Sequence, residues 1–404
     1  MCGINGIISK DKNKDKLIKS MNEKILHRGP DAEGIFVEGD VALGQRRLSI
    51  IDLAGGNQPI YNEDKSILIM YNGEVYNYKE LKEELTEYKF ETESDTEVVL
   101  HGYEKWGHDL PKKLRGMFAY AIYDKNKGEI FISRDQFGIK PLYYYHDGDT
   151  ILFGSEIKSF LAYPKFKKVL NKELLGAYLT FSFTPTDETF FKGVYRLPSG
   201  HSMTIDVKKR KIKIDRYFKV EFGNTDKSFD EVVEEIGKAM KDSTDHHLIS
   251  DVEVGSFLSS GVDSSYLVSL AKPDKTYTIG FDLAKYSEID YAKDLTDKLN
   301  IKNISEKISK EEYMNALSEV YYHMDEPTAD GCAIAVYFLS RLASKDVKVV
   351  LSGEGADEFF GGYNSYDDNF YTKLPFFIRK SMASICKILP KNKITRYIIR
   401  RGLP

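Results

Sequence analysis

The feature that most constrains the fold is a change in the pattern of predicted strands and helices about halfway along the chain. Up to Phe222, short apolar strands follow one another in runs, and two clear helices are predicted near 78–88 and 94–106. Ser94 and Glu97 have the spacing of a capping box, which predicts that the second helix begins there. Runs of strands favour an α+β fold with largely antiparallel sheets. The strands predicted in this half are 66–71, 129–133, 141–145, 150–154 and 201–206.

The second half of the chain has a different order of predicted strands and helices. From about residue 229, helices alternate with single apolar strands, which is typical of βαβ units and predicts an α/β domain with a parallel sheet. A chain of 404 residues is also too long for one ordinary core. We therefore expect two domains, 1–222 and 223–404, joined in the polar stretch from Gly223 to Ser228. The strands predicted in the second half are 252–258, 276–281 and 347–351.

Charge and composition restrict the classes of protein that fit. The net charge is −4, yet the stretch 373–404 carries nine basic residues and no acid. We interpret it as a helix of the second domain rather than as a basic amphipathic membrane helix. We find no membrane-spanning stretch, no secretory signal and no basic patch with interleaved aromatic residues, which argues against membrane and nucleic-acid partners. The three cysteines form no CxxC pair, so we expect a cytoplasmic setting without structural disulfides or zinc.

The second residue of the chain is a candidate nucleophile. Removal of Met1 would leave the thiol of Cys2 beside a free α-amine. A thiol with an ordinary pKa of about 8.5 is mostly protonated at neutral pH, whereas an α-amine with a pKa of about 8 can accept its proton. A cysteine is also a common small apolar residue, so the hypothesis of an N-terminal nucleophile depends on matching residues elsewhere.

Two loops in the second half follow predicted strands and have the composition of ligand-binding loops. One strand ends at Leu258 and leads into Ser-Ser-Gly-Val-Asp-Ser-Ser over 259–265, before a helix predicted to start near Tyr266. Small residues between a strand and a helix can bind phosphate at the positive end of the helix dipole. Asp263 would repel a bare phosphate, so nucleotide binding there implies Mg²⁺. A plain helix cap is the alternative that this loop alone leaves open.

The second loop follows the strand that ends at Leu351. It reads Ser-Gly-Glu-Gly-Ala-Asp-Glu over 352–358. The two strands are expected to be parallel, so both loops would lie at the same carboxyl edge of the sheet, where ligands bind. Asp263 and Asp357 would then be able to share a metal ion.

These residues together resemble the glutamine-dependent asparagine synthetase family over essentially the whole chain. The first half is similar to a class II glutamine amidotransferase domain, which has an N-terminal nucleophile (Ntn) hydrolase fold with layered antiparallel sheets. The second half is similar to the family's ATP-pyrophosphatase domain, whose loop usually reads Ser-Gly-Gly-x-Asp-Ser. The motifs that carry the resemblance are Cys2, 27–31, 46–52, 72–77, 94–97, 259–265 and 350–363.

The resemblance implies how the first half would hydrolyse glutamine. Cys2 would attack the side-chain amide of glutamine, and Asn72 and Gly73 would form the oxyanion hole. An oxyanion needs an amide N–H and a backbone N–H held in place, and an Asn-Gly pair after a strand can present both. His27 belongs to a motif of the family that suggests loop scaffolding, and we do not assign it to catalysis.

The resemblance also implies the residues that would bind glutamine. Arg47 would pair with the α-carboxylate of glutamine as a fixed fork, and Glu74 and Asp95 would hold its α-ammonium. For Asp95 the sequence leaves open a second interpretation, in which an acid in the first turn of a helix is stabilised by the helix dipole without any ligand. The implied glutamine-binding residues are Arg47, Ile50, Asn72, Gly73, Glu74 and Asp95.

For the second half the resemblance implies ATP and Mg²⁺, with Asp263 and Asp357 as metal ligands and Glu354 facing the reacting acyl group. The β-carboxylate of aspartate would attack the α-phosphorus of ATP to give β-aspartyl-AMP and pyrophosphate. Ammonia released at Cys2 and carried through an apolar channel would then displace AMP. A homodimer is compatible with the resemblance. The implied ATP-binding residues are Leu258, Ser259, Gly261, Asp263, Ser264, Ser265, Ile279, Ser352 and Gly353.

The sequence departs from the family pattern in three ways. Ser260 stands where the family usually has a second glycine, so a side chain is present where the backbone approaches phosphate. Gln45 stands near the place where many members have a histidine. The family typically continues for roughly another domain, so we expect this chain to be C-terminally truncated.

Two other functions stay open on the sequence alone. One keeps the chemistry and changes the acceptor to a carboxylate of a surface sugar or a peptide. A synthetase that closes β-lactams is disfavoured, because the glutaminase nucleophile Cys2 would serve no purpose there. The other is a bare glutaminase, or an inert interaction module, whose second domain is incompletely folded.

Overall fold

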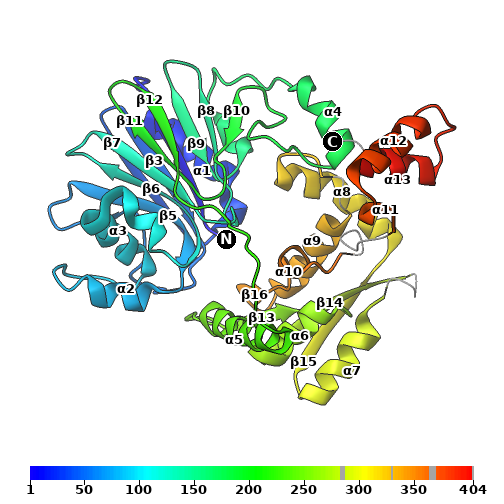
Figure 1. The fold of residues 1–404 in the computed structure, drawn as a ribbon. Coiled ribbons are helices and arrows are strands. Elements are labelled where there is room, and N and C mark those ends of the chain that lie inside the picture. The colour runs from blue at the N-terminus through cyan, green and yellow to red at the C-terminus, as the bar shows by residue number, and fades with distance from the viewer. Residues whose placement is uncertain (283–286, 329–330, 364–369, 403–404) are drawn as a thin grey trace. The chain divides into compact units, whose positions relative to one another are not determined.

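The computed structural model of the protein describes residues 1–282, 287–328, 331–363 and 370–402. The chain divides into two compact units, Met1–Leu351 and Ser352–Pro404. The first unit contains two antiparallel sheets and one parallel sheet (Figure 1), and the described part of the second unit is built from short helices.

The first antiparallel sheet contains the strand that follows Cys2. Its order is β10-β8-β9-β1-β3-β2, so β1 (Gly3–Ile8) lies between β9 and β3. All six residues of β1 are buried, as its apolar sequence requires for a strand covered on both faces. The other strands are β2 (Ala32–Glu38), β3 (Val41–Arg47), β8 (Tyr143–His146), β9 (Ile151–Gly154) and β10 (Val194–Arg196).

The second antiparallel sheet carries the Asn72-Gly73 pair. Its order is β12-β11-β7-β6-β5-β4. The strands predicted at 129–133 and 201–206 are confirmed, and the strand predicted at 66–71 extends further, to Val75. The strands are β4 (Ile60–Tyr61), β5 (Ile67–Val75), β6 (Gly116–Asp124), β7 (Glu129–Arg134), β11 (His201–Asp206) and β12 (Lys211–Arg216).

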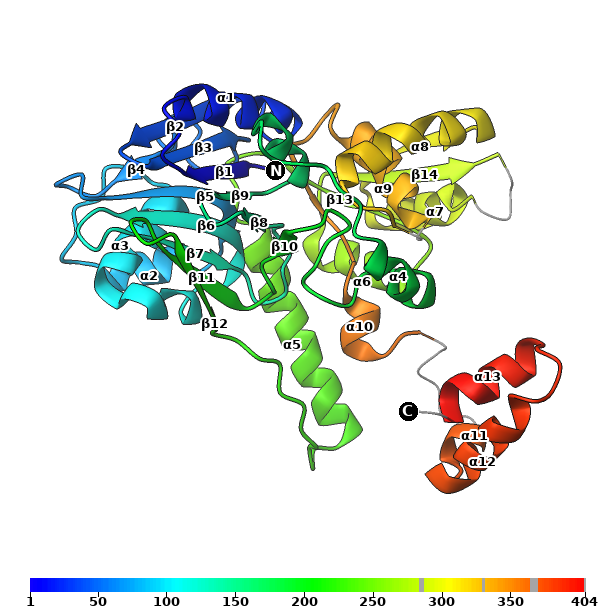
Figure 2. The ribbon, with the colours of Figure 1, turned by 90° about the horizontal axis from the view of Figure 1, so that it is seen from above.

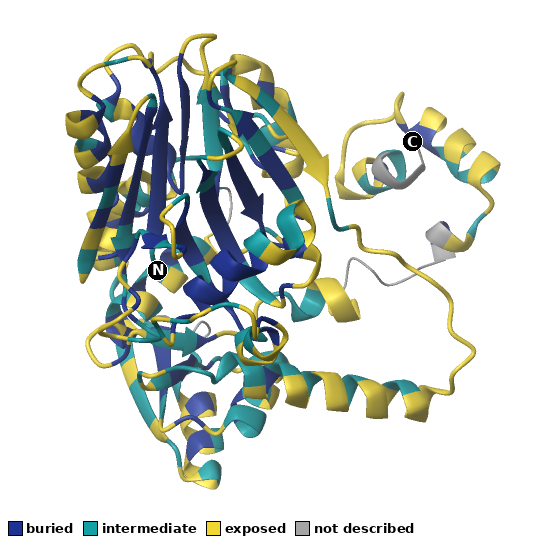
Figure 3. Ribbon diagram, turned by 90° about the vertical axis from the view of Figure 1, so that its left-hand side faces the viewer, coloured by how far each residue is buried: buried dark blue, intermediate teal, exposed yellow. Residues whose placement is uncertain are grey.

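The two antiparallel sheets stack face to face with helices on both outer sides (Figure 2). An apolar cluster between the sheets joins residues of both, such as Ile4 and Leu68. A second cluster packs Ile18 of α1 (Lys14–Lys24) and Phe160 of the 3-10 helix η3 (Ile157–Ala162) onto the first sheet. A third packs Val99 of α3 (Asp95–Trp106) onto the second sheet. Figure 3 shows that the strands of these sheets are largely buried. This order of helix, sheet, sheet and helix confirms the layered antiparallel fold that the resemblance implied.

The helices of this layered part are short. The predicted helix near 78–88 ends at Glu84 in the structure, while the predicted helix at 94–106 is confirmed. The helices are α1 (Lys14–Lys24), η1 (Leu26–Arg28), α2 (Tyr78–Glu84), α3 (Asp95–Trp106), η2 (Gly107–Lys112), η3 (Ile157–Ala162), η4 (Lys172–Leu174) and α4 (Leu175–Phe181).

The N-terminus of α3 differs in one detail from the predicted capping box. Ser94 is the N-cap residue, and its side chain accepts a hydrogen bond from the amide of Thr96. The carboxylate of Glu97 does not accept the hydrogen bond from the backbone amide of Ser94 that a capping box requires. It accepts hydrogen bonds from the amides of Glu91 and Thr92, at 2.8 and 2.6 Å, because the preceding loop folds over the first turn of the helix.

The parallel sheet confirms the βαβ pattern of the second half. Its order is β15-β14-β13-β16, and all three neighbouring pairs run parallel. Strand β15 was not predicted, because its polar residues hide the strand pattern at the edge of the sheet. The strands are β13 (Val254–Phe257), β14 (Lys275–Phe281), β15 (Lys302–Ile308) and β16 (Val349–Leu351).

Helices cover both faces of the parallel sheet. Tyr277 of β14 packs with residues of α8 and α9 in one cluster, and Leu258 packs with residues of α6 and α7 in another. This arrangement is the usual result of parallel crossover connections. The helices of this region are α5 (Phe229–His247), α6 (Val262–Ala271), α7 (Ile289–Leu299), α8 (Lys310–Met324) and α9 (Cys332–Ala343).

The second compact unit contains the basic stretch at the end of the sequence. The prediction of helix there is confirmed, because α12 and α13 occupy most of it. Several large apolar side chains on this stretch are exposed, including Phe377 and Ile388. No helix in the described part of the chain combines the length and apolar character that crossing a membrane requires. The helices are α10 (Ala356–Phe360), α11 (Phe370–Lys373), α12 (Phe376–Cys386) and α13 (Lys393–Gly402).

Candidate active sites

Cys2 lies at the start of β1, beside the end of β3. Gly3 pairs with Arg46 across the two strands, which brings the residues that follow Arg46 close to the thiol. The amide of Leu48 donates a hydrogen bond to Cys2 Sγ at 3.3 Å, and Sγ donates to the carbonyl oxygen of Leu48 at 3.5 Å. Arg28 Nε donates to the carbonyl oxygen of Cys2 at 2.8 Å. The half-buried thiol is therefore held by Leu48, and the backbone of Cys2 is held by Arg28, as a positioned nucleophile requires.

The surroundings of the amino terminus favour a neutral amine. Burial is the main cause that lowers the pKa of the Met1 α-amine to about 5, and the positive charge of Arg28 acts in the same direction. A neutral amine can accept a thiol proton, whereas an ammonium cannot. The structure contains Met1, so the predicted base, which is the α-amine of Cys2 itself, requires removal of Met1.

Asn72 and Gly73 lie side by side on β5. The side chain of Asn72 is buried, and neither its Oδ1 nor its Nδ2 atom has a hydrogen-bond partner among the described residues. A buried amide without partners costs about 1–3 kcal/mol, so the amide is available to a ligand without first breaking a bond. A Cβ atom at Gly73 would lie 2.5 Å from the Met117 carbonyl oxygen, which only glycine avoids. The amide of Asn72 fits the predicted oxyanion hole, and the close packing on β6 explains why residue 73 is a glycine; the role of both residues stays a prediction.

Arg47 is held rigidly by the loop that follows it. The side chain is only 4% exposed. Its Nη1 donates to Asn57 Oδ1 at 2.9 Å, and its Nη2 donates to the carbonyl oxygens of Asp52 at 2.6 Å and Ile51 at 3.1 Å. The loop thus fixes the plane of the guanidinium, as recognition of a carboxylate requires. Ile50 is half-buried next to this loop, and its carbonyl oxygen accepts a hydrogen bond from the amide of Asp251.

The two predicted ligands of the glutamine ammonium differ in their bonding. Burial raises the pKa of Glu74 to about 7, although the positive charge of Lys140 acts in the opposite direction. Asp95 lies in the first turn of α3, and its Oδ2 accepts hydrogen bonds from Tyr71 Oη at 2.7 Å and from the Val75 amide at 2.9 Å. Asp95 therefore fastens α3 to β5, a structural role that needs no ligand, and its role as a ligand of glutamine stays a prediction.

A buried lysine lies close to these residues and was not predicted. Lys140 is 4% exposed, and its Nζ lies 3.2 Å from Met1 Sδ. Burial lowers the pKa of Lys140, while the negative charge of Glu74 opposes that shift. The sequence offers no signal for such a residue, since lysines are almost always on the surface.

A chain of ion pairs leads from Arg28, which bonds to the backbone of Cys2, to the end of α8. Arg28 Nη1 pairs with Glu156 Oε1 at 3.0 Å, and Glu156 also contacts Lys158. Lys158 Nζ in turn lies 3.0 Å from an oxygen of Asp325, which directly follows α8. His27 Nε2 lies 2.9 Å from Glu156 Oε1, so His27 is part of this chain of contacts.

The loop after β13 has the predicted form with one correction. Helix α6 begins at Val262, not near Tyr266, so Asp263, Ser264 and Ser265 lie in its first turn. Gly261 is the N-cap residue and makes no side-chain cap, which leaves amide donors of the first turn for a ligand. Ser260 Oγ donates to Glu288 Oε1 at 2.6 Å, so the residue that replaces the family's glycine directs its hydroxyl to a neighbouring acid.

Within the same loop, two serines are linked to each other. Ser259 Oγ and Ser264 Oγ lie 2.9 Å apart, and the amide of Gly261 donates to Ser259 Oγ at 3.1 Å. These bonds hold the loop in a compact turn in front of α6. The carboxylate of Asp263 has no cationic partner among the residues that the structure describes, so it is available to a metal ion.

Leu258 and Ile279 were predicted to line the nucleotide pocket. Both side chains are buried, and each packs in a hydrophobic cluster, Leu258 with Val268 and Ile279 with Tyr277. The backbone of Leu258 is bonded to β14, because its amide donates to the Tyr277 carbonyl oxygen. The structure thus assigns these two side chains to the core, and their contact with a nucleotide stays a prediction.

Strands β13 and β16 run parallel with Ser256 opposite Leu351, so both end at the same edge of the sheet. Ser352, Gly353, Glu354 and Asp357 belong to the second compact unit. There the amide of Glu354 donates to Ser352 Oγ at 3.4 Å, and Asp357 lies in the first turn of α10. A metal ion shared by Asp263 and Asp357 stays a prediction.

Comparison with known proteins defines the class of both halves. A family model described as a glutamine amidotransferase domain matches residues 1–218, and one described as asparagine synthase matches residues 235–396. The layered antiparallel fold around Cys2 and the parallel sheet that follows it are therefore those of an amidotransferase domain joined to a synthase domain.

Individual relatives identify the family. The chain is 42% identical over 417 residues to asparagine synthetase (glutamine-hydrolyzing) 1 of Bacillus subtilis, covering 100% of this chain and 66% of that protein. It is 38% identical over 414 residues to a putative asparagine synthetase (glutamine-hydrolyzing) 2 of Methanocaldococcus jannaschii, covering 94% and 79%. A putative asparagine synthetase of Mycobacterium tuberculosis is 37% identical over 403 residues, covering 93% and 62%. The chain belongs to the glutamine-hydrolysing asparagine synthetase family, and it spans 62–79% of the length of these relatives.

Proposed function

We propose that this protein makes L-asparagine from L-aspartate with ATP and with ammonia taken from glutamine. The reaction would release AMP, pyrophosphate and glutamate. The observation that carries the proposal is the 42% identity over the whole chain to a protein named asparagine synthetase (glutamine-hydrolyzing). The buried amide of Asn72 on β5, which has no hydrogen-bond partner among the described residues, supports the glutaminase part.

In the glutaminase part, Cys2 Sγ attacks the side-chain amide carbon of glutamine as the α-amine of Cys2 takes the thiol proton. Asn72 Nδ2 and the Gly73 amide donate hydrogen bonds to the oxyanion that forms. The carbon–nitrogen bond then breaks, and the proton held by the amine leaves with ammonia. Water attacks the remaining thioester and releases glutamate, which restores the thiol.

The glutamine would be oriented by three charged groups and one apolar residue. Arg47 pairs with its α-carboxylate, because the guanidinium is already fixed by bonds to Asp52 and Asn57. Glu74 and Asp95 face its α-ammonium, and Ile50 packs against the substrate. The buried position of Glu74 and Asp95 strengthens their attraction to a cation, because water screens it less.

In the synthetase part, the β-carboxylate of aspartate attacks the α-phosphorus of ATP, forming β-aspartyl-AMP and releasing pyrophosphate. Ammonia then attacks the acyl carbon and displaces AMP. The pyrophosphate binds to amides and hydroxyls at the start of α6, which belong to Ser259, Gly261, Ser264 and Ser265. The list of proposed nucleotide contacts is completed by Leu258, Asp263, Ile279, Ser352 and Gly353.

The residues of these loops fit Mg²⁺, which prefers carboxylate oxygens and phosphate together. Asp263 and Asp357 each lie in the first turn of a helix, and we assign them as the metal ligands. When bound, Mg²⁺ would neutralise phosphate charge. Glu354 is proposed to face the reacting acyl group.

The proposal also covers the domain boundary, the oligomeric state and the cellular location of the protein. We place the domain boundary between residues 222 and 223, which lies in the stretch between the two family matches. A homodimer and a cytoplasmic location are part of the same proposal, in accord with small-molecule substrates.

The experiment is to incubate the chain, with Met1 removed, with glutamine, aspartate, ATP and Mg²⁺. Mass spectrometry then measures glutamate, AMP and asparagine together. All three are expected, and Cys2→Ala should lose glutamate yet still make asparagine from added ammonium. Glutamate without AMP or asparagine would refute asparagine synthesis by this chain and leave a glutaminase, whereas AMP released with another carboxylic acid would identify a different acceptor.

A further inference from the structure

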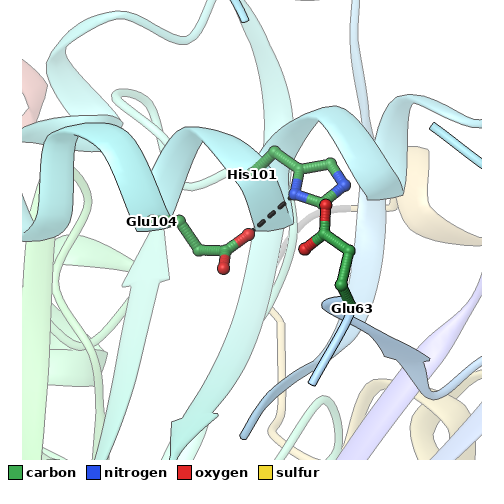
Figure 4. A group of neighbouring side chains, drawn as sticks. All are labelled: Glu63, His101 and Glu104. Atoms are coloured by element: carbon green, nitrogen blue, oxygen red, sulfur yellow. Dashed lines mark hydrogen bonds and ion pairs between the residues drawn. The ribbon is translucent and has the colours of Figure 1, made fainter. Parts of the chain in front are cut away.

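Outside the proposed active sites, three side chains with metal-binding groups converge. Glu63 lies in the turn between β4 and β5, and His101 and Glu104 lie one turn apart on α3 (Figure 4). One nitrogen of His101 and one oxygen of each carboxylate all lie within 4.8 Å of one another. We propose that Glu63, His101 and Glu104 bind a divalent transition-metal ion, for which Zn²⁺ is the best fit.

His101 is the central residue of this cluster. It is 1% exposed, and its ring packs between Tyr88 and Phe90, whose ring centroids lie 4.9 and 5.0 Å away. Nδ1 lies 2.7 Å from Glu104 Oε2. Nε2 lies 3.7 Å from Glu97 Oε1 and has no hydrogen-bond partner among the described residues. The ring is thus fixed in position while one of its nitrogens is left without a hydrogen bond.

The neighbouring residues orient this cluster as those of a metal site do. A histidine on a metal ion usually donates its other N–H group to a carboxylate. With the ion on Nδ1, the N–H group on Nε2 would point to Glu97, whose own oxygens are fixed by the amides of Glu91 and Thr92. Glu104 is oriented in the same way, because its Oε1 accepts a hydrogen bond from Asn62 Nδ2 at 2.8 Å.

Glu63 supplies the third ligand of the set, and its exposed position gives a metal ion access from solvent. Its side chain is exposed, and the bond that its carboxylate accepts from the Lys89 amide is long, at 3.4 Å. A rotation of this side chain can therefore bring its oxygen to the distance of about 2.1 Å that Zn²⁺ requires. Glu63 and His101 also line a cavity of about 360 Å³. Three protein ligands leave the fourth position of a tetrahedral ion to water from this cavity.

The donor set distinguishes this site from the Mg²⁺ sites of the proposed synthetase. Mg²⁺ and Ca²⁺ prefer oxygen ligands alone, whereas imidazole favours zinc and its transition-metal neighbours. The sequence argued against a zinc site built from cysteines, and this cluster contains none. Its three ligands come from a turn and a helix that only the fold brings together, so their spacing along the chain matches no short metal motif.

Without an ion, the same residues form an ion-pair group. Nδ1 of His101 lies 2.7 Å from Glu104 Oε2, and Nε2 lies 3.7 Å from Glu97 Oε1. These contacts pair His101 with Glu104 and Glu97 and do not use Glu63. The metal-bound and metal-free states therefore differ in whether Glu63 contacts the other residues. Substitution of Glu63 should affect zinc binding and leave the ion-pair group intact.

The test is equilibrium dialysis and calorimetry of the whole chain with Zn²⁺, in the absence of glutamine, ATP and Mg²⁺. We expect Glu63→Gln to weaken zinc binding at least tenfold. Asp64→Asn is the matched control, because it removes the same charge from the neighbouring exposed residue, whose Oδ1 accepts a hydrogen bond from the Ser66 amide instead. His108→Asn is a second control, because His108 pairs with Glu129 outside the cluster.

Thiols are the competing zinc ligands, so Co²⁺ is used as a spectroscopic probe. Binding at the proposed site gives d–d bands without a thiolate-to-cobalt charge-transfer band, and Cys2→Ala leaves those bands unchanged. Glu104→Gln should abolish them. Zinc should also raise the melting temperature of the parent chain and of Asp64→Asn, but not that of Glu63→Gln.

Three results would overturn the proposal: equal zinc affinity in the parent chain and in Glu63→Gln, cobalt spectra dominated by thiolate bands, or no zinc bound at all. Because Glu63 is exposed, its variant is expected to melt at the parent temperature without metal, which separates a lost ligand from a lost fold. None of these measurements depends on asparagine synthesis, so the failure of one proposal does not imply the failure of the other.

Discussion

Arg28 bonds through Nε to the carbonyl oxygen of Cys2 at 2.8 Å and through Nη1 to Glu156 at 3.0 Å. One guanidinium therefore holds the backbone of the predicted nucleophile against a buried carboxylate. A lysine ammonium is a single point charge and does not reproduce this fork. We expect Arg28→Lys to lower the glutaminase kcat by roughly tenfold or more, measured as glutamate release. Arg210→Lys, at an ion pair with Asp40 that lies elsewhere, should leave it unchanged.

Asn72 should matter for catalysis and not for stability. Its amide has no hydrogen-bond partner to lose among the described residues. Removal of one oxyanion-hole donor typically lowers kcat by about 10²–10³-fold, so Asn72→Ala should do the same without lowering the melting temperature. Asn77→Ala is the control, because Asn77 bonds to the backbone of Lys113 and Arg115. It should lower the melting temperature and retain kcat, and the reverse pattern would contradict the assignment.

Gly73 should not tolerate a side chain. A Cβ atom there would lie 2.5 Å from the Met117 carbonyl oxygen and 2.8 Å from the Phe118 Cα atom, both on β6. Gly73→Ala should therefore lower the free energy of unfolding by about 1–3 kcal/mol, as overpacking does. Gly176→Ala on α4 meets no atom of the described residues within 4 Å and should be neutral or stabilising. Urea unfolding of both variants measures the difference, and similar values would argue against close packing of β5 on β6.

Glutamine binding should weaken in acid because of Glu74. Burial raises the pKa of Glu74 to about 7, so its carboxylate is neutral below that pH and no longer attracts the substrate ammonium. We expect the glutaminase KM for glutamine to rise as the pH falls from 8 to about 6. In Glu74→Gln the KM should be high throughout this range and should not change with pH in this way.

A second variant tests the cause of that pKa. The positive charge of Lys140 lowers the pKa of Glu74, so Lys140→Met should move the rise in KM to higher pH. Lys127→Met is a suitable control, because Lys127 pairs with Asp124 at the far end of β6. An unchanged pH profile in Lys140→Met would mean that Glu74 does not control glutamine binding.

Glu156 should contribute to stability only above strongly acidic pH. Burial raises its pKa, but the bond from His27 and the charges of Arg28 and Lys158 outweigh burial and lower it to about 2. A carboxyl group with a lowered pKa stabilises the fold above its unfolded pKa of about 4.5, and this contribution is lost as the pH falls toward 2. The contribution is on the order of 3 kcal/mol. In Glu156→Gln, unfolding free energies measured between pH 5 and 2 should decline less steeply than in the parent chain.

Some elements followed directly from local sequence. The strand at 201–206 and the helix at 94–106 were predicted, because alternation and a Ser N-cap are local signals. Strand β6 was missed although it is the partner of β5, since its continuous apolar run does not distinguish a buried strand from a buried helix. Helix α6 begins four residues earlier than predicted, because Asp and Ser suit the first helical turn as well as a loop.

The sequence by itself determined the two kinds of sheet, the family, and the residues that carry its motifs, because these depend on local periodicity and on residue types at fixed spacing. Only the tertiary structure decided the environment of those residues. Three features depend on neighbours far away in the chain. They are the bonds of Cys2 to Leu48, the burial of Lys140, and the amide of Asn72, for which the described residues offer no hydrogen-bond partner. The cluster of Glu63 and His101 has the same origin, since desolvation and charge pairing are set by packing between segments that the sequence alone does not bring together.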